Sequence, residues 1–275
     1  MTARQHAPAE AFFLDGPRGE RFCLYHAPQG ACRGALVYVH PFAEEMNKSR
    51  RMAAMAARAL AATGYGVLQI DLHGCGDSDG EFGEARWEHW QDDLAVASTW
   101  LAQRSAQPVG LWGLRLGALL ALDYARSARE PVAQLVLWQP VLQGAAFMTQ
   151  FLRLRVAGAM LNDAAEGTGG TRELRAALQA GQALEVAGYL LAPELAAAID
   201  ARDALQLAPP CPVHWIEIVA AEERAFTPVA LRVAAEWERQ GTAPALHKVA
   251  APPFWSTQEI AQAPKLIDVT CALLQ

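Results

Sequence analysis

Short apolar runs alternate with longer amphipathic stretches along most of this chain. A strand buried on both faces is continuously apolar, whereas a helix packed on a sheet repeats its apolar positions every three or four residues. The segments predicted as strands are residues 35–39, 66–72, 108–112, 134–138, 213–219 and 246–250. The segments predicted as helices are residues 46–63, 87–101, 116–122, 229–238 and 258–274. This alternation with short links predicts an α/β fold built on a mostly parallel, doubly wound sheet.

Two further features complete the predicted layout. Residues 11–15 and 21–26 are strand candidates on either side of a Gly-Pro turn cluster, and they predict an antiparallel edge of the sheet. Between residues 141 and 207 the strand–helix alternation stops, and the pattern indicates helices alone. We therefore expect one domain, residues 1–275, in which residues 141–207 form a helical lid over the carboxyl edge of the sheet.

The most informative segment is a strand that leads through Gly113, Arg115 and Gly117 into a helix. A tight strand-to-helix turn needs glycine at both flanking positions, because a side chain there would collide with the strand or the helix. The spacing resembles the nucleophile elbow, G-x-S-x-G, of α/β-hydrolases. Arg115 stands where the nucleophile is expected. A guanidinium is permanently protonated and is not a nucleophile, so this turn lacks the usual serine chemistry.

Composition narrows the classes of function. The net charge is −6 and no basic run occurs, which argues against a nucleic-acid partner. The first residues lack the form of a signal peptide, and no apolar run reaches the roughly 18 residues of a membrane span. The five cysteines are scattered, which predicts a reduced, cytoplasmic protein. Metal-ligand spacings such as C-x-x-C are missing from the sequence, so we expect no metal and no cofactor.

Five stretches carry a closer resemblance to known proteins. They are H-P-F-A-E-E-M-N-K-S-R from residue 40, D-L-H-G-C-G-D-S-D-G from residue 71, W-G-L-R-L-G from residue 112, Q-F-L-R-L-R from residue 150 and P-P-F-W-S-T-Q-E-I from residue 252. Residues 22–274 resemble the α/β-hydrolase superfamily. The five stretches resemble the second of the two hydrolases associated with the bacterial exosortase A system. This resemblance implies a cytoplasmic hydrolase of the ester or thioester class, with a protein partner in the exosortase and exopolysaccharide system.

The catalytic triad of such enzymes needs a nucleophile, an acid and a histidine, in that chain order. The acid is expected after the strand at residues 213–219, where Glu222 is a candidate. The histidine is expected in the loop after the next strand, but this loop contains Trp255 and no histidine. A relocated pair of Cys75 and His40 would be the remaining source of a nucleophile and a base.

Arg115 has three interpretations. Beside the backbone amide of Leu116, at the start of a helix, it would bind an anionic ligand in a pocket that His40, Phe42 and Trp255 help to line. Alternatively it is paired internally, because an unpaired buried charge is costly. In the third interpretation it gives electrostatic help to a reaction at another group. The candidate internal partners are Glu44, Glu45, Glu217 and Glu222.

Two classes of function therefore stay open. The first is a hydrolase or acyltransferase that acts on an ester or thioester through a non-standard nucleophile. The second is a catalytically inactive pseudo-hydrolase whose pocket, centred on Arg115, binds an anionic small molecule or a partner protein. The family resemblance favours the first class, and the residues at the nucleophile and histidine positions favour the second.

Overall fold

The computed structural model describes residues 8–161 and 170–275. Its central sheet has eight strands. They are β1 (Glu10–Gly16), β2 (Gly19–His26), β3 (Gly34–Val39), β4 (Tyr65–Ile70), β5 (Val109–Leu114), β6 (Leu135–Trp138), β9 (Val213–Val219) and β10 (Ala245–Ala250). They lie in the order β1-β2-β4-β3-β5-β6-β9-β10. The β1–β2 and β2–β4 pairs are antiparallel and the other pairs are parallel, so the antiparallel edge is at the amino-terminal hairpin.

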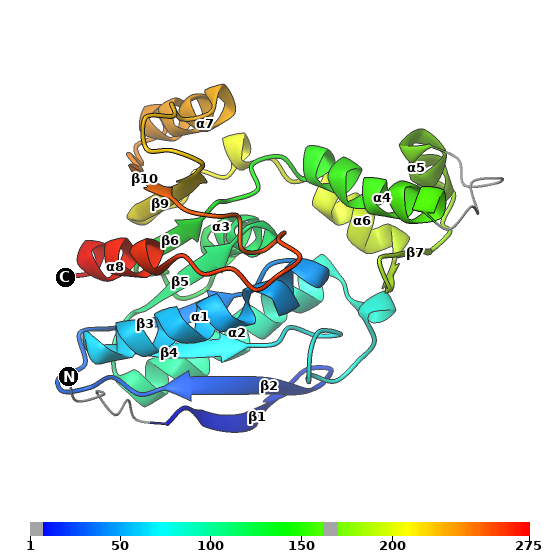
Figure 1. Ribbon diagram of the computed structural model, residues 1–275. Helices are drawn as coiled ribbons and strands as arrows, with labels where there is room; N and C mark the ends of the chain where they lie inside the picture. The colour runs from blue at the N-terminus through cyan, green and yellow to red at the C-terminus, as the bar shows by residue number, and fades with distance from the viewer. Residues whose placement is uncertain (1–7, 162–169) are drawn as a thin grey trace.

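Helices cover both faces of this sheet (Figure 1). They are α1 (Glu44–Ala62), α2 (Trp87–Ser105), α3 (Leu116–Ser127), α7 (Pro228–Arg239) and α8 (Pro264–Leu273). α1 and α8 pack on one face around Met52, Leu60 and Leu266. α2 and α3 pack on the other face, where Trp87 and Leu94 are buried at helical spacing. The central strands are therefore buried on both sides, which explains their unbroken apolar sequences.

A separate layer lies beyond the carboxyl ends of the parallel strands (Figure 1). It consists of α4 (Gly144–Leu161), α5 (Thr171–Gln179), the hairpin of β7 (Leu184–Val186) and β8 (Tyr189–Leu191), and α6 (Pro193–Asp200). The 3₁₀ turn η2 (Ala204–Gln206) follows this layer and packs against α7. A second 3₁₀ turn, η1 (Phe82–Glu84), lies beside β8. Phe151 of α4 packs on Phe42, in the loop after β3, with ring centroids 4.9 Å apart. This contact holds α4 over the rim of the sheet.

The predicted fold class is confirmed: the protein is an α/β fold with a mostly parallel, doubly wound sheet and the α/β-hydrolase arrangement. Two local predictions are wrong. The last helix begins at Pro264 rather than at residue 258, since proline is tolerated in the first turn of a helix but not in its interior. The segment of residues 141–207 also contains the β7–β8 hairpin, whose strands have three residues each and are too short to show a periodicity. Residues 162–169 of this segment lie outside the described residues.

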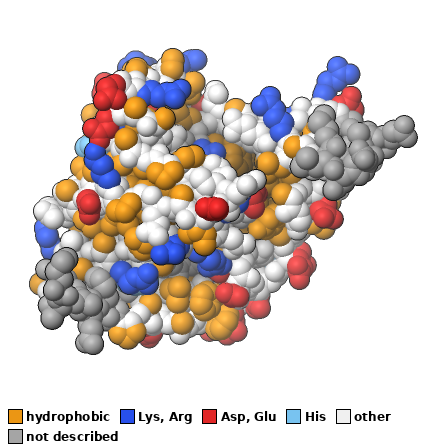
Figure 2. Space-filling model, in the orientation of Figure 1, with side chains coloured by type: hydrophobic (Ala, Val, Ile, Leu, Met, Phe, Trp, Pro, Cys, Tyr) orange, Lys and Arg blue, Asp and Glu red, His pale blue; other side chains and the backbone are white. Residues whose placement is uncertain are grey.

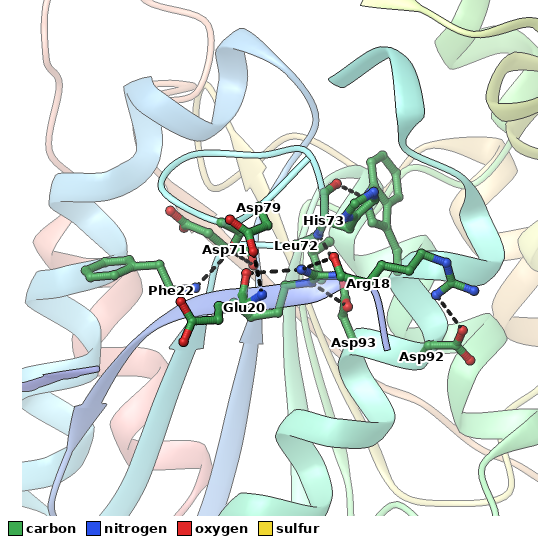
Figure 3. Close-up of polar contacts among 12 residues, drawn as sticks. Arg18, Glu20, Phe22, Asp71, Leu72, His73, Asp79, Asp92 and Asp93 are labelled. Atoms are coloured by element: carbon green, nitrogen blue, oxygen red, sulfur yellow. Dashed lines mark hydrogen bonds and ion pairs between the residues drawn. The ribbon is translucent and has the colours of Figure 1, made fainter. Parts of the chain in front are cut away.

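Polar contacts attach the amino-terminal hairpin to the loop that follows β4 (Figure 3). Arg21 of β2 and Asp93 of α2 form an ion pair of 2.7 Å in which both side chains are fully buried. The second oxygen of Asp93 accepts a hydrogen bond of 2.7 Å from the backbone N–H of His73. At the surface, the backbone N–H of Glu20 donates to Asp79. These contacts order the Gly-Asp loop that borders the rim.

Candidate functional site

The turn between β5 and α3 has the backbone of a nucleophile elbow. Arg115 adopts φ 55° and ψ −118°, a conformation that side-chain-bearing residues rarely take. A Cβ atom at Gly117 would lie 2.3 Å from the carbonyl oxygen of Val39 and 2.4 Å from that of His40. A Cβ atom at Gly113 would come within 2.5 Å of the backbone of α3. The steric role assigned to both glycines from the sequence is confirmed.

Arg115 is paired with Glu45, in the first turn of α1. Its Nε atom lies 3.3 Å from Glu45 Oε1, and the two side chains are 17% and 13% exposed. Glu222, the predicted triad acid, instead forms an exposed ion pair with Lys265. Glu217 is buried in β9, where burial raises its pKa. Among the acids proposed from the sequence as partners, Glu45 is therefore the one that contacts the arginine.

Two aromatic rings enclose the guanidinium. Its central carbon lies 5.4 Å from the ring centroid of Trp255 and 6.0 Å from that of Phe147. Trp255 comes from the loop after β10, the position expected for a triad histidine, and Phe147 comes from α4. A cation over an aromatic face gains electrostatic attraction, which grows as water is excluded. The two positions that hold nucleophile and base in a serine hydrolase here hold an arginine and a tryptophan in contact with each other.

The surroundings of Arg115 also shift the pKa of Glu45. Burial raises its pKa to about 7, and the nearby Arg115 guanidinium opposes that rise. The buried Oε2 atom of Glu45 has no hydrogen-bond partner. In the Arg115–Glu45 pair, one carboxylate oxygen is therefore hydrogen-bonded and the other is buried without a partner. Burying an ionised carboxylate with an unsatisfied oxygen costs free energy.

The proposed pair of Cys75 and His40 is not assembled as a nucleophile and a base. His40 Nδ1 lies 2.8 Å from the carbonyl oxygen of Pro41, and its Nε2 accepts a hydrogen bond of 3.2 Å from the backbone N–H of Leu72. Both ring nitrogens are therefore occupied, and burial lowers the His40 pKa, which keeps the ring neutral. Burial also raises the pKa of the Cys75 thiol, which disfavours the reactive thiolate.

We expect Cys75 to resist alkylation in the folded protein because its thiol is buried and its thiolate is disfavoured. Iodoacetamide at neutral pH should modify the more exposed Cys32 at least about tenfold faster than Cys75. Peptide mass spectrometry over a time course measures both rates, and the unfolded protein in urea provides the control in which the two thiols react alike. Equal rates in the folded state would contradict the buried, protonated thiol.

The space at the elbow is small. A cavity of about 10 Å³ lies between His40, Phe42, Cys75 and Leu116. This volume is close to the minimum for a single water molecule. Leu116 begins α3, so its backbone N–H has no acceptor within the helix and stays available to an anion at the elbow. Leu116 thus stands where an oxyanion-binding amide would be needed, but the cavity beside it has no room for an acyl chain.

Two larger hollows open on the same rim. One, of about 180 Å³, is lined by Arg115, Phe147, Gln143 and Gln150 and by Val229 at the start of α7. Figure 2 shows the surface hollowed between the α7 lobe and the α4–α6 layer. The other, of about 520 Å³, lies along the opposite side of α1 and includes Arg50 in its lining. Arg115 therefore borders the first hollow and is not among the residues that line the second.

Within residues 8–161 and 170–275, no group of three or more His, Cys, Asp or Glu side chains is placed to hold a metal ion. No helix in these ranges combines the length and apolar character that crossing a membrane requires. The first seven residues, on which the expectation about a signal peptide depends, lie outside the described part of the chain.

The sequence predicts that Arg115, Leu116, His40, Phe42 and Trp255 lie near one another, and the structure places all five around the elbow. It left the partner of Arg115 open among four acids and did not connect Phe147 with the arginine. One feature of the sequence pointed to Glu45 as the partner: it lies just after the loop that follows β3. This position does not distinguish Glu45 from Glu44, which lies in the same turn of α1 and is not the acid that pairs with Arg115.

The sheet order, the strained turn and the helical layers define the architecture as that of an α/β-hydrolase. Residues 30–207 match the family described as serine aminopeptidase, S33, and the chain belongs to this family. Human protein ABHD12B is 33% identical over 127 residues, which are 45% of this chain and 34% of that protein. The match thus spans about a third of the length of the human relative.

Solved structures support the same fold at low sequence identity. Est1E from Butyrivibrio proteoclasticus with bound ferulic acid superposes with a TM-score of 0.70 and 12% identity, covering 96% of both chains. A soluble variant of the monoglyceride lipase from Saccharomyces cerevisiae, in complex with a substrate analog, gives a TM-score of 0.62 and 13% identity, covering 99% of this chain and 97% of that one. At this level of identity the likeness concerns the fold alone.

Proposed function

We propose that this protein is a pseudo-hydrolase that binds a small anionic ligand at Arg115 and does not hydrolyse esters by a serine triad. The observation that carries the proposal is the guanidinium at the nucleophile position. Only its Nε atom is hydrogen-bonded to a described residue, and Arg115 lines a hollow of about 180 Å³. The two terminal nitrogens match the two oxygens of a carboxylate or phosphate.

The alternative is a hydrolase that acts on an ester or thioester, as family membership would suggest. It needs a nucleophile and a base within hydrogen-bond distance of each other. Arg115 and Trp255 occupy the two triad positions, and both nitrogens of His40 are bonded elsewhere. The Cys75 thiol has a raised pKa and no hydrogen bond to His40 among the described contacts. These observations favour the binding function.

The cellular setting is part of the proposal. The five stretches that resemble the second exosortase A-associated hydrolase support a cytoplasmic protein of the bacterial exosortase and exopolysaccharide system. In this proposal a protein of that system is the partner, and the ligand is an anionic or acyl small molecule. Residues 141–207 act as a lid, a role supported by the contact of Phe147 with the guanidinium of Arg115.

The proposal predicts no ester or thioester turnover. Purified protein, Arg115→Ala and Cys75→Ala should all give the buffer rate with acyl esters and acyl thioesters of several chain lengths. Arg115→Ser should be equally inactive, because a serine without a base to accept its proton is a weak nucleophile. A fluorophosphonate probe should label neither the natural protein nor Arg115→Ser.

Three outcomes would contradict this prediction in different ways. Turnover that Cys75→Ala removes would identify a displaced nucleophile. Turnover that only Arg115→Ala removes would make the arginine an electrostatic catalyst. Failure of the natural protein to bind butanoate or sulfate in calorimetric titration, with the same result for Arg115→Ala, would remove the anion site itself.

A further inference from the structure

We propose that an anion bound at Arg115 is bound together with one proton, which Glu45 takes up. This inference rests on the proposed function, because it concerns the same arginine. It adds a role for Glu45 as the group that competes with the ligand for Arg115 and makes binding depend on pH. The ligand class it specifies is a small anion, such as a short-chain carboxylate or sulfate, that fits the hollow beside Arg115.

The first step is the incomplete ion pair. The distance of 3.3 Å between Arg115 Nε and Glu45 Oε1 exceeds the roughly 2.7–2.9 Å of a well-formed charge-assisted hydrogen bond. Oε2 of Glu45 is buried without a partner. The described residues provide no acceptor for the two terminal nitrogens of Arg115. A guanidinium can bind a second carboxylate through this terminal edge while Glu45 remains beside Nε.

The second step is the hollow that Arg115 helps to line. Its lining includes Gln143 and Gln150, whose amides can donate to an anion, and the apolar Phe147 and Val229. No acidic side chain belongs to its described lining, so Arg115 is the charge that a ligand meets there. An opening of about 180 Å³ suits a compact ligand of a few heavy atoms rather than a polymer or a long acyl chain.

The third step concerns the groups around Glu45. The charged side chains that act on it are Glu44 and Lys48 on α1 and Arg115 at the elbow. The buried phenol of Tyr38 on β3 is also near, because Glu45 contributes to raising the Tyr38 pKa. The rings of Trp255 and Phe147, which enclose the guanidinium, carry no titratable group. Arg115 is therefore the main group that keeps the Glu45 carboxylate ionised, with a smaller contribution from Lys48.

An anion on Arg115 changes this balance. Two negative charges would share one cation, so the pKa of Glu45, already raised to about 7 by burial, would rise further in the complex. Below about pH 7 Glu45 is protonated with or without the ligand, and affinity is highest. Above that pH the free protein is ionised at Glu45 and must gain a proton on binding. Affinity then falls as pH rises, by up to about tenfold per pH unit.

The experiment is calorimetric titration of the full chain with butanoate and with sulfate, neither of which titrates in the window from about pH 6 to about pH 9. Two buffers of different ionisation enthalpy report the protons taken up. For the natural protein we expect affinity to fall at least about tenfold between pH 7 and pH 9, with net proton uptake above pH 7. Glu45→Gln, a neutral mimic of the protonated acid, should bind equally well at every pH and exchange no protons.

Two further variants separate the possible failures. Glu44→Gln, on the same helical turn, should keep the pH slope with a slightly shifted midpoint, and Arg115→Gln should lose binding at every pH. If the natural protein binds neither anion, the proposed function fails and this inference fails with it. If it binds with an affinity independent of pH, or if Glu45→Gln keeps the slope, the anion site stands and the role of Glu45 is overturned. Matching melting temperatures confirm that each variant is folded.

Discussion

Asp93→Ala is expected to lower the free energy of unfolding by about 3–5 kcal/mol. Asp93 is fully buried and accepts hydrogen bonds from Arg21 Nε and from the backbone N–H of His73, both at 2.7 Å. Its removal leaves the guanidinium of Arg21, also fully buried, without a counter-charge. The fold has already removed that charge from water. Losing its partner therefore lowers the free energy of unfolding much more than breaking a surface pair does.

The adjacent acid provides a matched control. Asp92 pairs with Arg18 at 2.9 Å, but the two side chains are 49% and 36% exposed (Figure 3). Asp92→Ala should therefore change stability by less than about 1 kcal/mol. Urea unfolding followed by tryptophan fluorescence measures both variants. Combining Asp93→Ala with Arg21→Met should recover part of the loss because no buried charge is left. Equal, small effects of Asp92→Ala and Asp93→Ala would contradict the buried pair.

Trp138→Ala is expected to cost about 3–5 kcal/mol and to disturb the site as well. The fully buried indole lies 4.6 Å from the ring of Trp112 and donates a hydrogen bond of 3.0 Å to Thr270. It also packs edge-on against Phe254, the residue before the tryptophan that covers Arg115. A large cavity at the end of β6 would remove this support, and the Thr270 hydroxyl would lose the hydrogen bond that it accepts from the indole.

The same urea experiment tests this prediction, with anion binding as a second measurement. Trp138→Phe keeps most of the packing and loses the hydrogen bond, so it should cost less than half as much as the alanine variant. Leu231→Ala, at a position 49% exposed on α7, should be nearly neutral and serves as the control. A cost below about 1 kcal/mol for Trp138→Ala would show that the residues around β6 collapse to fill the space.

Much of the fold follows from local sequence patterns. The unbroken apolar runs of β3, β5 and β6 predict strands buried on both faces, and the structure buries every residue of these strands. The spacing of Gly113 and Gly117 predicts a strained turn, because the collisions that exclude a side chain involve backbone atoms. The β7–β8 hairpin could not be predicted in the same way, since its short strands are stabilised by packing against η1 and α4.

The sequence by itself determined the α/β-hydrolase architecture and the presence of a cation where a nucleophile is expected. Both are properties of short segments and of covalent chemistry, which do not depend on distant residues. Only the tertiary structure decided that Arg115 pairs with Glu45, 70 residues away, and that Trp255 and Phe147 enclose the guanidinium. Those contacts depend on where α1, α4 and the loop after β10 meet at the rim, which is set by the packing of the whole sheet.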